Sequence, residues 1–151
     1  MFKDLETEYI LDKLETYDRA LKDWQDIVGL QDKTLIDMMS ERESWISYYT
    51  SLKIEINKML DYIESKKKRL LAGRVEHLIK TLTIRMNDTT LNNLARQDNE
   101  YVEWELLSYE VRERYNIASA ACDQLSQISY SITNYIKIKE LGLERSRLDN
   151  N

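Results

Sequence analysis

Residues 34–72 read TLIDMMSERESWISYYTSLKIEINKMLDYIESKKKRLLA, and this stretch decides the fold. It contains neither proline nor glycine, the two residues that most weaken a helix interior. Its apolar side chains recur at steps of three and four, which places them on one face of a helix. That face holds Leu35, Met38, Trp45, Tyr49, Leu52, Ile56, Met59 or Leu60, Ile63 and Leu70, with Arg42 as an interruption. The pattern predicts one continuous amphipathic helix.

This helix is long for a chain of 151 residues. At 1.5 Å per residue, residues 34–72 span about 58 Å, more than the diameter of a compact domain of this mass. We therefore expect the helix to project from its domain or to be shared with another copy. Trp45, Tyr49, Leu52 and Ile56 are accordingly predicted to line either the core or a subunit interface.

The segment before residue 34 predicts another helix, over about residues 3–28. Gly29 stands where a helix C-cap is expected, and Thr34 is a candidate N-cap for the long helix, with Asp37 in its first turn. The apolar residues of the N-terminal segment also alternate steps of four and three. They are Ile10, Leu14, Tyr17, Leu21, Trp24 and Val28.

Gly73 is expected to end or kink the long helix, which then continues to residue 86. The polar residues 87–90 predict a connection to a last helix over about residues 90–141. Gly142 is expected to end that helix, and residues 143–151 are expected to form a frayed tail. Its apolar stripe includes Trp104, Val111, Leu125 and Ile132, with smaller residues such as Ala118 and Cys122 between them.

These patterns predict an all-α fold: residues 1–151 form a single domain of three long heptad-patterned helices, an elongated bundle that oligomerises. Exposed apolar and aromatic surface on elongated helices favours the oligomer. The single cysteine fits a reducing compartment, and no apolar stretch approaches the length of a membrane span. The N-terminus is charged from the start and has no signal-peptide pattern. We therefore expect a cytoplasmic protein, of a bacterial cell or a phage-infected one, with no membrane contact.

The residue types that enzymes use are scarce. The chain has one histidine and one cysteine, His77 and Cys122, in segments far apart. The Glu-x-x-His motif of carboxylate-bridged metal sites does not occur, since Glu76 and His77 are adjacent and point to different faces of a helix. The three glycines are too far apart to form a phosphate-binding loop. The sequence predicts no enzyme, no metal site and no cofactor.

Positive charge is gathered in one segment. Residues 1–64 hold 8 Lys/Arg and 15 Asp/Glu, residues 65–86 hold 7 and 1, and residues 87–151 hold 7 and 11. The acidic N-terminal helix, within residues 1–30, thus precedes a basic central segment, residues 65–86. Two interpretations remain open at this point: the basic segment binds anions, or it pairs with the acidic helices.

The anion-binding interpretation names specific residues. Four consecutive cations, residues 66–69, wrap around a helix, so one acidic neighbour cannot satisfy them all. Such a surface attracts phosphates without reading sequence, and single-strand binders add aromatic stacking platforms. Tyr62 lies four residues before the cations, and Tyr48 is a more distant candidate. The predicted nucleic-acid contacts are Lys66, Lys67, Lys68, Arg69, Arg74, Lys80, Arg85 and Tyr62.

Residues 52–68 followed by Gly73 resemble the central helix of the UvsY-type phage recombination mediators. Leu94 and Asp98, placed before a long helix through residues 123–136, extend the resemblance, which covers about residues 45–142. It implies a small helical protein that assembles into rings, binds single-stranded DNA and helps a strand-exchange recombinase displace the single-strand-binding protein.

The same resemblance implies that the cations of residues 66–69 contact DNA. One departure concerns the aromatic pair that the family often has just before its glycine. Leu70 and Leu71 stand there in this chain. Stacking at that point is therefore in doubt, and charge alone would carry the binding.

Two other classes of function fit the sequence. A helical adaptor or inhibitor would act through protein contacts alone, and it explains the acidic helices and the exposed aromatic residues. It does not explain why the cations are gathered in one segment. A structural coiled-coil protein needs only the apolar repeats. Binding of single-stranded DNA, measured as a function of salt, separates the first class from these two.

Overall fold

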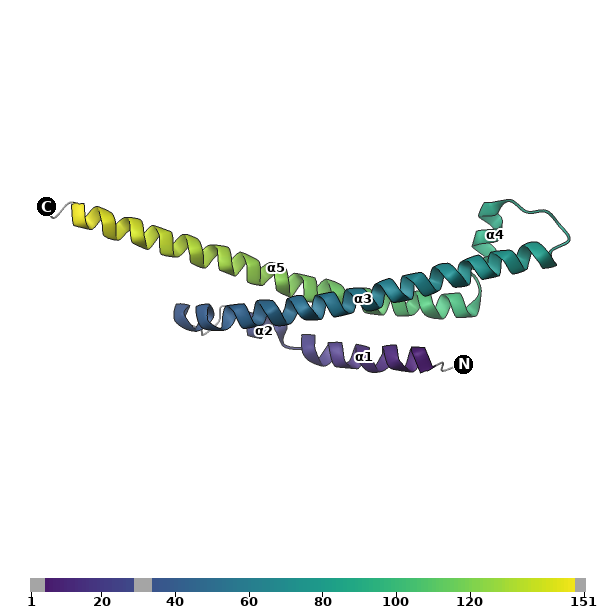
Figure 1. The fold of residues 1–151 in the computed structure, drawn as a ribbon, viewed down its shortest axis with the longest axis horizontal. Helices are drawn as coiled ribbons and strands as arrows, with labels where there is room; N and C mark the ends of the chain where they lie inside the picture. The colour runs from purple at the N-terminus through teal and green to yellow at the C-terminus, as the bar shows by residue number, and fades with distance from the viewer. Residues whose placement is uncertain (1–4, 29–33, 149–151) are drawn as a thin grey trace.

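The computed structural model describes residues 5–28 and 34–148, and every regular element within them is a helix. The predicted all-α class is therefore confirmed. The molecule is an elongated rod with its two longest helices along the long axis (Figure 1). The helices are α1 (Leu5–Leu21), α2 (Trp24–Val28), α3 (Leu35–Thr81), α4 (Asp88–Ala95) and α5 (Asn99–Leu148).

Helices α3 and α5 run antiparallel and form most of the core. Lys67 in the second half of α3 meets Ser108 near the start of α5, whereas Thr50 in its first half meets Cys122 further along. The apolar face that the sequence predicts for residues 34–72 packs in this contact, because the 3.6-residue repeat keeps it turned towards α5.

The centre of this contact is apolar and closely packed. Tyr49, Ile56 and Ile63 of α3 are 0% exposed, as are Val111 and Ala118 of α5. Burying a side chain of the size of Ile or Val stabilises a fold by about 1.5–3 kcal/mol. Of the eight residues predicted to form the seam, Trp45 is half-buried and the others are buried within one chain. These others are Tyr49, Leu52, Ile56, Trp104, Val111, Leu125 and Ile132.

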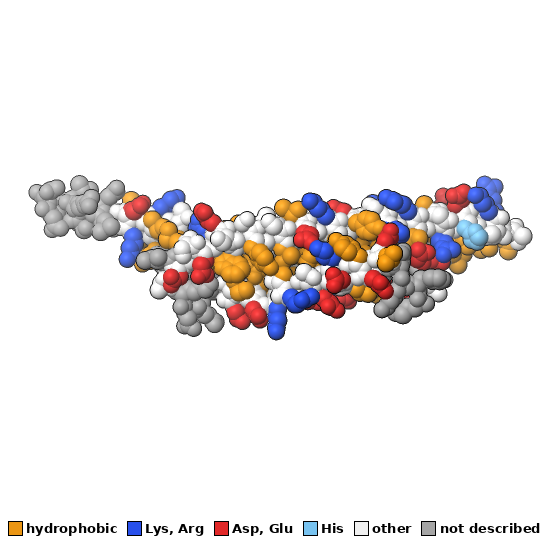
Figure 2. Space-filling model, turned by 60° about the horizontal axis from the view of Figure 1, so that its bottom comes forward, with side chains coloured by type: hydrophobic (Ala, Val, Ile, Leu, Met, Phe, Trp, Pro, Cys, Tyr) orange, Lys and Arg blue, Asp and Glu red, His pale blue; other side chains and the backbone are white. Residues whose placement is uncertain are grey.

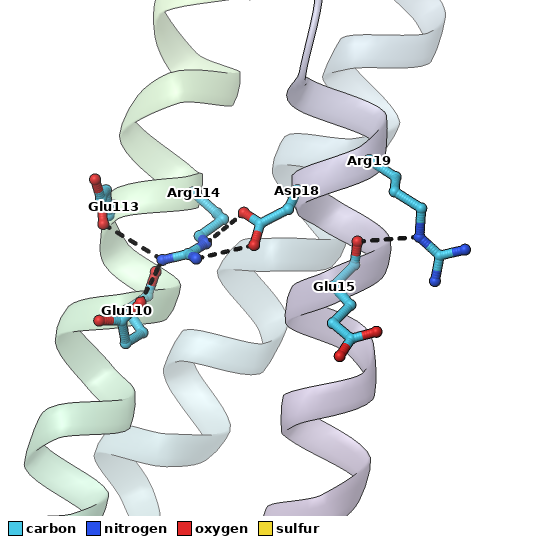
Figure 3. Close-up of polar contacts among 6 residues, drawn as sticks. All are labelled: Glu15, Asp18, Arg19, Glu110, Glu113 and Arg114. Carbon is cyan, nitrogen blue, oxygen red and sulfur yellow. Dashed lines mark hydrogen bonds and ion pairs between the residues drawn. The ribbon is translucent and has the colours of Figure 1, made fainter.

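Helix α1 lies along the α3–α5 pair and buries Ile10, Leu14, Tyr17 and Leu21. Its second half is also held by charge. The guanidinium group of Arg114 on α5 donates to both carboxylate oxygens of Asp18, at 2.8 and 3.0 Å (Figure 3). Two parallel N–H···O bonds of this kind fix direction as well as distance. The burial and the ion pair together set the register of α1 against α5.

The predicted N-terminal helix, residues 3–28, is interrupted. Helix α1 ends at Leu21, and a short turn leads into α2, where the carbonyl oxygen of Asp23 accepts from the backbone of Ile27 at 3.0 Å. Trp24, at the start of α2, still packs against the core, on the apolar stripe that the sequence predicts. The predicted cap at Gly29 lies outside the described residues, whereas Thr34 caps α3 as predicted, in a capping box with Asp37.

The break predicted at Gly73 is wrong, because α3 continues through it to Thr81. A glycine costs a helix interior only about 1 kcal/mol relative to alanine, and a helix packed on both sides of it absorbs that cost. The helix also stops short of residue 86, at Leu82, whose backbone is extended. Gly142 does not end α5 either, since the helix runs to Leu148; the predicted tail is helical as far as the description reaches.

The helix predicted over residues 90–141 is two helices. Asn87 caps α4 by accepting from the backbone of Thr90 at 2.8 Å. A turn then leads to α5, where the carboxylate of Asp98 accepts from the backbone N–H groups of Glu100 and Tyr101. Short polar side chains favour caps and turns because they satisfy the free N–H groups of a helix start. Asp98 thus starts α5 nine residues later than predicted.

The two long helices extend past each other at the ends of the rod (Figure 1). The second half of α5 carries three strongly exposed apolar residues, Tyr130, Ile138 and Leu141, at 71, 68 and 60%. None of the helices within residues 5–28 and 34–148 is long and apolar enough to cross a bilayer.

Candidate nucleic-acid interface

The second half of α3 carries a basic groove, which we define by Lys66, Arg69, Leu70, Gly73, Arg74 and His77 of α3 with Glu100 of α5. Its volume is about 400 Å³. The members on α3 share one face, because residues three, four, seven and eleven positions apart lie on the same side of a helix. Gly73 contributes no side chain to the groove, which leaves its middle open.

Acidic residues partly neutralise the basic groove. The guanidinium group of Arg74 lies 3.0 Å from Asp98 and 3.8 Å from Glu100. The ammonium group of Lys66 donates to the carboxylate of Glu6 on α1 at 2.9 Å. Arg69 is exposed and forms no ion pair with any described residue. The groove therefore offers one unpaired guanidinium group, with two paired cations beside it.

Lys66 is also placed by an aromatic ring. Its ammonium group lies 5.3 Å from the centre of the Trp104 ring of α5. A cation over an aromatic face is stabilised by the ring's charge distribution. Two hydrogen bonds lower the pKa of the Glu6 carboxyl group, and the bond from Lys66 has a larger effect than the bond from Tyr62. The carboxyl group therefore stays ionised in the pair. Charge, ring and carboxylate together hold the Lys66 side chain at the edge of the groove.

Lys67 has a different environment from its neighbours. Its side chain is only 12% exposed, and its ammonium group donates to Ser108 at 3.3 Å and to Glu64 at 3.4 Å. It also lies 4.0 Å from Glu105 and 5.9 Å from the ring centre of Tyr101. Lys67 therefore joins α3 to α5 and is not free to bind a phosphate.

The remaining predicted cations lie outside the groove. Lys68 is exposed and forms no ion pair with a described residue, and Lys80 pairs with Glu76 one turn earlier. Arg85 lies past the end of α3, in a separate hollow of about 380 Å³ between α3 and α4. The structure thus brings together three of the seven predicted cations, Lys66, Arg69 and Arg74.

The two aromatic candidates differ in position. Tyr62 is 46% exposed and packs edge-on against Trp104 at 6.3 Å, one turn before Lys66. The pKa of Tyr62 is raised, mainly by burial and to a lesser extent by the hydrogen bond to Glu6. Tyr48 is half-exposed but packs edge-on against Tyr49 at 5.2 Å. It lies about 27 Å along α3 from Lys66, too far to act with the basic groove.

The structure supports the pairing interpretation of the basic segment in part, and the anion-binding interpretation stays a prediction. Lys66, Lys67, Arg74 and Lys80 pair with carboxylates, as expected of a helix that packs against acidic neighbours. The pairs at Lys66, Arg74 and Lys80 are exposed or half-exposed, and such pairs contribute only about 0–1 kcal/mol. A phosphate can therefore compete for these cations, which is not true of Lys67.

Sequence reasoning assigns His77 to the basic face without naming it as a contact, and it misses the contribution of Trp104. His77 lines the groove, three residues after Arg74 and on the same face of α3. Its position follows from helical spacing along α3, which continues through Gly73. Trp104 was predicted as a core residue only. Its contact with Lys66 depends on the register of α5 against α3, which has no signal in the sequence.

Comparisons of the chain with protein-family models, with curated proteins and with solved structures found no match. The resemblance to UvsY-type mediators therefore stays a prediction. Among the described residues there is no cluster of three or more His, Cys, Asp or Glu side chains that could hold a metal ion.

Proposed function

We propose that this protein binds single-stranded DNA without reading its sequence, as an oligomer, in the manner of a recombination mediator. The observation that carries the proposal is the basic groove, where Lys66, Arg69 and Arg74 lie on one face of α3 beside His77. Guanidinium and ammonium groups at this spacing suit a run of phosphates. Tyr62, one turn away and half-exposed, is available for stacking with a base.

A single groove with one unpaired arginine binds weakly, and the chain as a whole has a net charge of −5. Assembly overcomes this weakness, because several grooves on one strand bind with a high effective concentration. The exposed apolar residues in the second half of α5, among them Tyr130 and Ile138, support such an assembly. Partners of the mediator type, a strand-exchange recombinase and a single-strand-binding protein, rest on the resemblance of residues 45–142.

The test is binding of a fluorescent oligo-dT strand as a function of salt, with sedimentation of the same sample to fix the subunit number. For Z contacted phosphates the log–log slope is about −0.7Z. Arg69→Ala should flatten the slope by about 0.7, the contribution of one phosphate contact. Arg19→Ala removes the same charge from an exposed site on α1 and should leave the slope unchanged.

Two results would contradict this assignment. Equal slopes for the parent and Arg69→Ala would remove the basic groove from the binding site. A folded monomer that binds no single strand even at about 20 mM salt would contradict the function itself. The mediator role has its own measurement: addition of the protein should let a strand-exchange recombinase displace the single-strand-binding protein from DNA.

A second function, a helical adaptor that binds another protein, is favoured by one observation. An apolar groove of about 510 Å³ lies between α1 and α3, lined by residues that include Leu5, Tyr9, Met59 and Tyr62. Figure 2 shows hydrophobic side chains exposed along the rod, with acidic and basic ones on either side. An amphipathic helix suits such a groove. An adaptor of this kind would show no salt-dependent binding to single strands.

A further inference from the structure

The two halves of α1 are held very differently. In the second half, Leu14 and Tyr17 are buried at 6 and 1% exposure. The hydroxyl of Tyr17 donates to Glu55 at 3.2 Å, and Arg114 binds both oxygens of Asp18 (Figure 3). This half is anchored to both α3 and α5 by apolar contact and by directional bonds.

The first turn and a half of α1 lacks this anchoring. Leu5 and Tyr9 are 83 and 59% exposed, and the apolar groove separates them from α3. Glu6 joins this part of α1 to α3 through polar contacts: its carboxylate accepts from Lys66 at 2.9 Å and also from the hydroxyl of Tyr62. Because that pair is partly exposed, it is a weak restraint.

The contact of Glu6 lies at the edge of the basic groove, since Lys66 is a member of it. A carboxylate and a phosphate oxygen make the same charge-assisted hydrogen bond to an ammonium group. Glu6 and a nucleic-acid phosphate therefore compete for one donor. This competition concerns Lys66 and not Arg69, the next cation of the groove. Arg69 has no carboxylate partner among the described residues, so a phosphate that binds it displaces none of them.

We propose that residues 5–9 of α1 form an acidic latch, in which Glu6 occupies Lys66 until a phosphate of the bound strand replaces it. The inference rests on the proposed function of the basic groove and adds its regulation. The strand binds first at Arg69 and then displaces Glu6. Residues 5–9 swing away from α3 while Tyr17 and Asp18 keep the rest of α1 in place, so the latch closes again when the strand leaves.

The experiment compares two neutral variants of the full chain, Glu6→Gln and Glu8→Gln. Both remove one negative charge from the same region of α1, but Glu8 is exposed and forms no ion pair with a described residue. Oligo-dT affinity is measured at a fixed salt concentration. Glu6→Gln should bind about two- to fivefold more tightly than the parent, since an exposed ion pair contributes at most about this factor. Glu8→Gln should change affinity by less than 1.5-fold.

Hydrogen exchange gives the second measurement. Oligo-dT should speed exchange at the backbone amides of residues 9–11 of the parent protein, which lose their helical acceptors in residues 5–7, and leave the amide of Leu21 protected. The latch is wrong if Glu6→Gln and Glu8→Gln tighten binding equally, which indicates general charge repulsion, or if DNA slows exchange at residues 9–11. If parent and variants are folded but none of them binds single strands, the proposed function fails, and the latch fails with it.

Discussion

The apolar part of α3, residues 49–63, and its basic part, residues 66–77, belong to one unbroken helix, yet the sequence predicts them with very different success. In the apolar part, the residues that share the predicted face, such as Tyr49 and Ile56, are buried as a set. In the basic part, neighbouring residues of the same charge differ in their exposure to solvent. Lys67 is enclosed between α3 and α5, whereas Arg69, two residues on, is exposed.

The difference has a physical cause. Burial of an apolar side chain depends on its face of the helix, which a repeat of 3.6 residues specifies. The role of a lysine depends on whether a carboxylate or hydroxyl of another helix lies within about 3 Å, which is a matter of register. Lys67 meets Ser108 only because α5 starts at Asn99 and packs antiparallel to α3.

The largest effect tests the apolar part. Ile56→Ala, at a site that is 0% exposed, should lower the free energy of unfolding by about 2–5 kcal/mol, because it removes buried methyl groups and leaves a cavity. Urea denaturation followed by circular dichroism measures the change. Ile54→Ala, two residues earlier and 50% exposed, is the matched control and should cost less than about 1 kcal/mol. Equal losses would show that α3 does not present the described face to α5.

A smaller effect tests the basic part directly. Lys67→Ala should lower the free energy of unfolding by about 1–2 kcal/mol, because it removes the nearly buried ammonium group that donates to Ser108 and Glu64, while Glu64 keeps its ion pair with Arg112. Lys68→Ala, next in sequence and exposed, should change stability by less than about 0.5 kcal/mol. Thermal melting of the two variants at equal protein concentration gives the comparison. If Lys68→Ala proved the more destabilising, the assignment of Lys67 as the structural lysine would be overturned.

The smallest effect tests the continuity of α3 between the two parts. Gly73→Ala should raise the free energy of unfolding by about 0.5–1 kcal/mol, because alanine restricts the unfolded chain and suits a helix interior. A methyl group at this position meets no atom within 4 Å, so no clash offsets the gain. A melting temperature that falls on substitution would indicate that the chain bends at Gly73, as the sequence alone suggests.

The prediction of the site was limited in the same way, because packing between helices decides which residues share the groove. Lys66, Arg69 and Arg74 were all proposed as phosphate contacts, and they share the basic groove. His77, which the sequence places on the basic face, lines the same groove, whereas the helix break expected at Gly73 is absent. Whether a glycine ends a helix is decided by about 1 kcal/mol against the packing on either side of it. The sequence shows the glycine but not the packing.

Helix ends are likewise predicted correctly only where neighbouring residues in the sequence determine them. Thr34 starts α3 as predicted, since a capping box is a local arrangement of residues three apart. The turn at Arg96–Asp98 also has a local signal in Asp98, whose side chain caps the start of α5. The turn between α1 and α2 has no such signal in the sequence.

The sequence by itself determined the helical class, the rod-like proportions and the identity of the core. These follow from the absence of proline, the scarcity of glycine and the apolar repeat, all of which act within a few residues along one helix. The tertiary structure alone decided which cations face water and that Glu6 reaches Lys66. These contacts join residues far apart in the chain, and their existence depends on the register between helices, which the summed packing of many side chains selects.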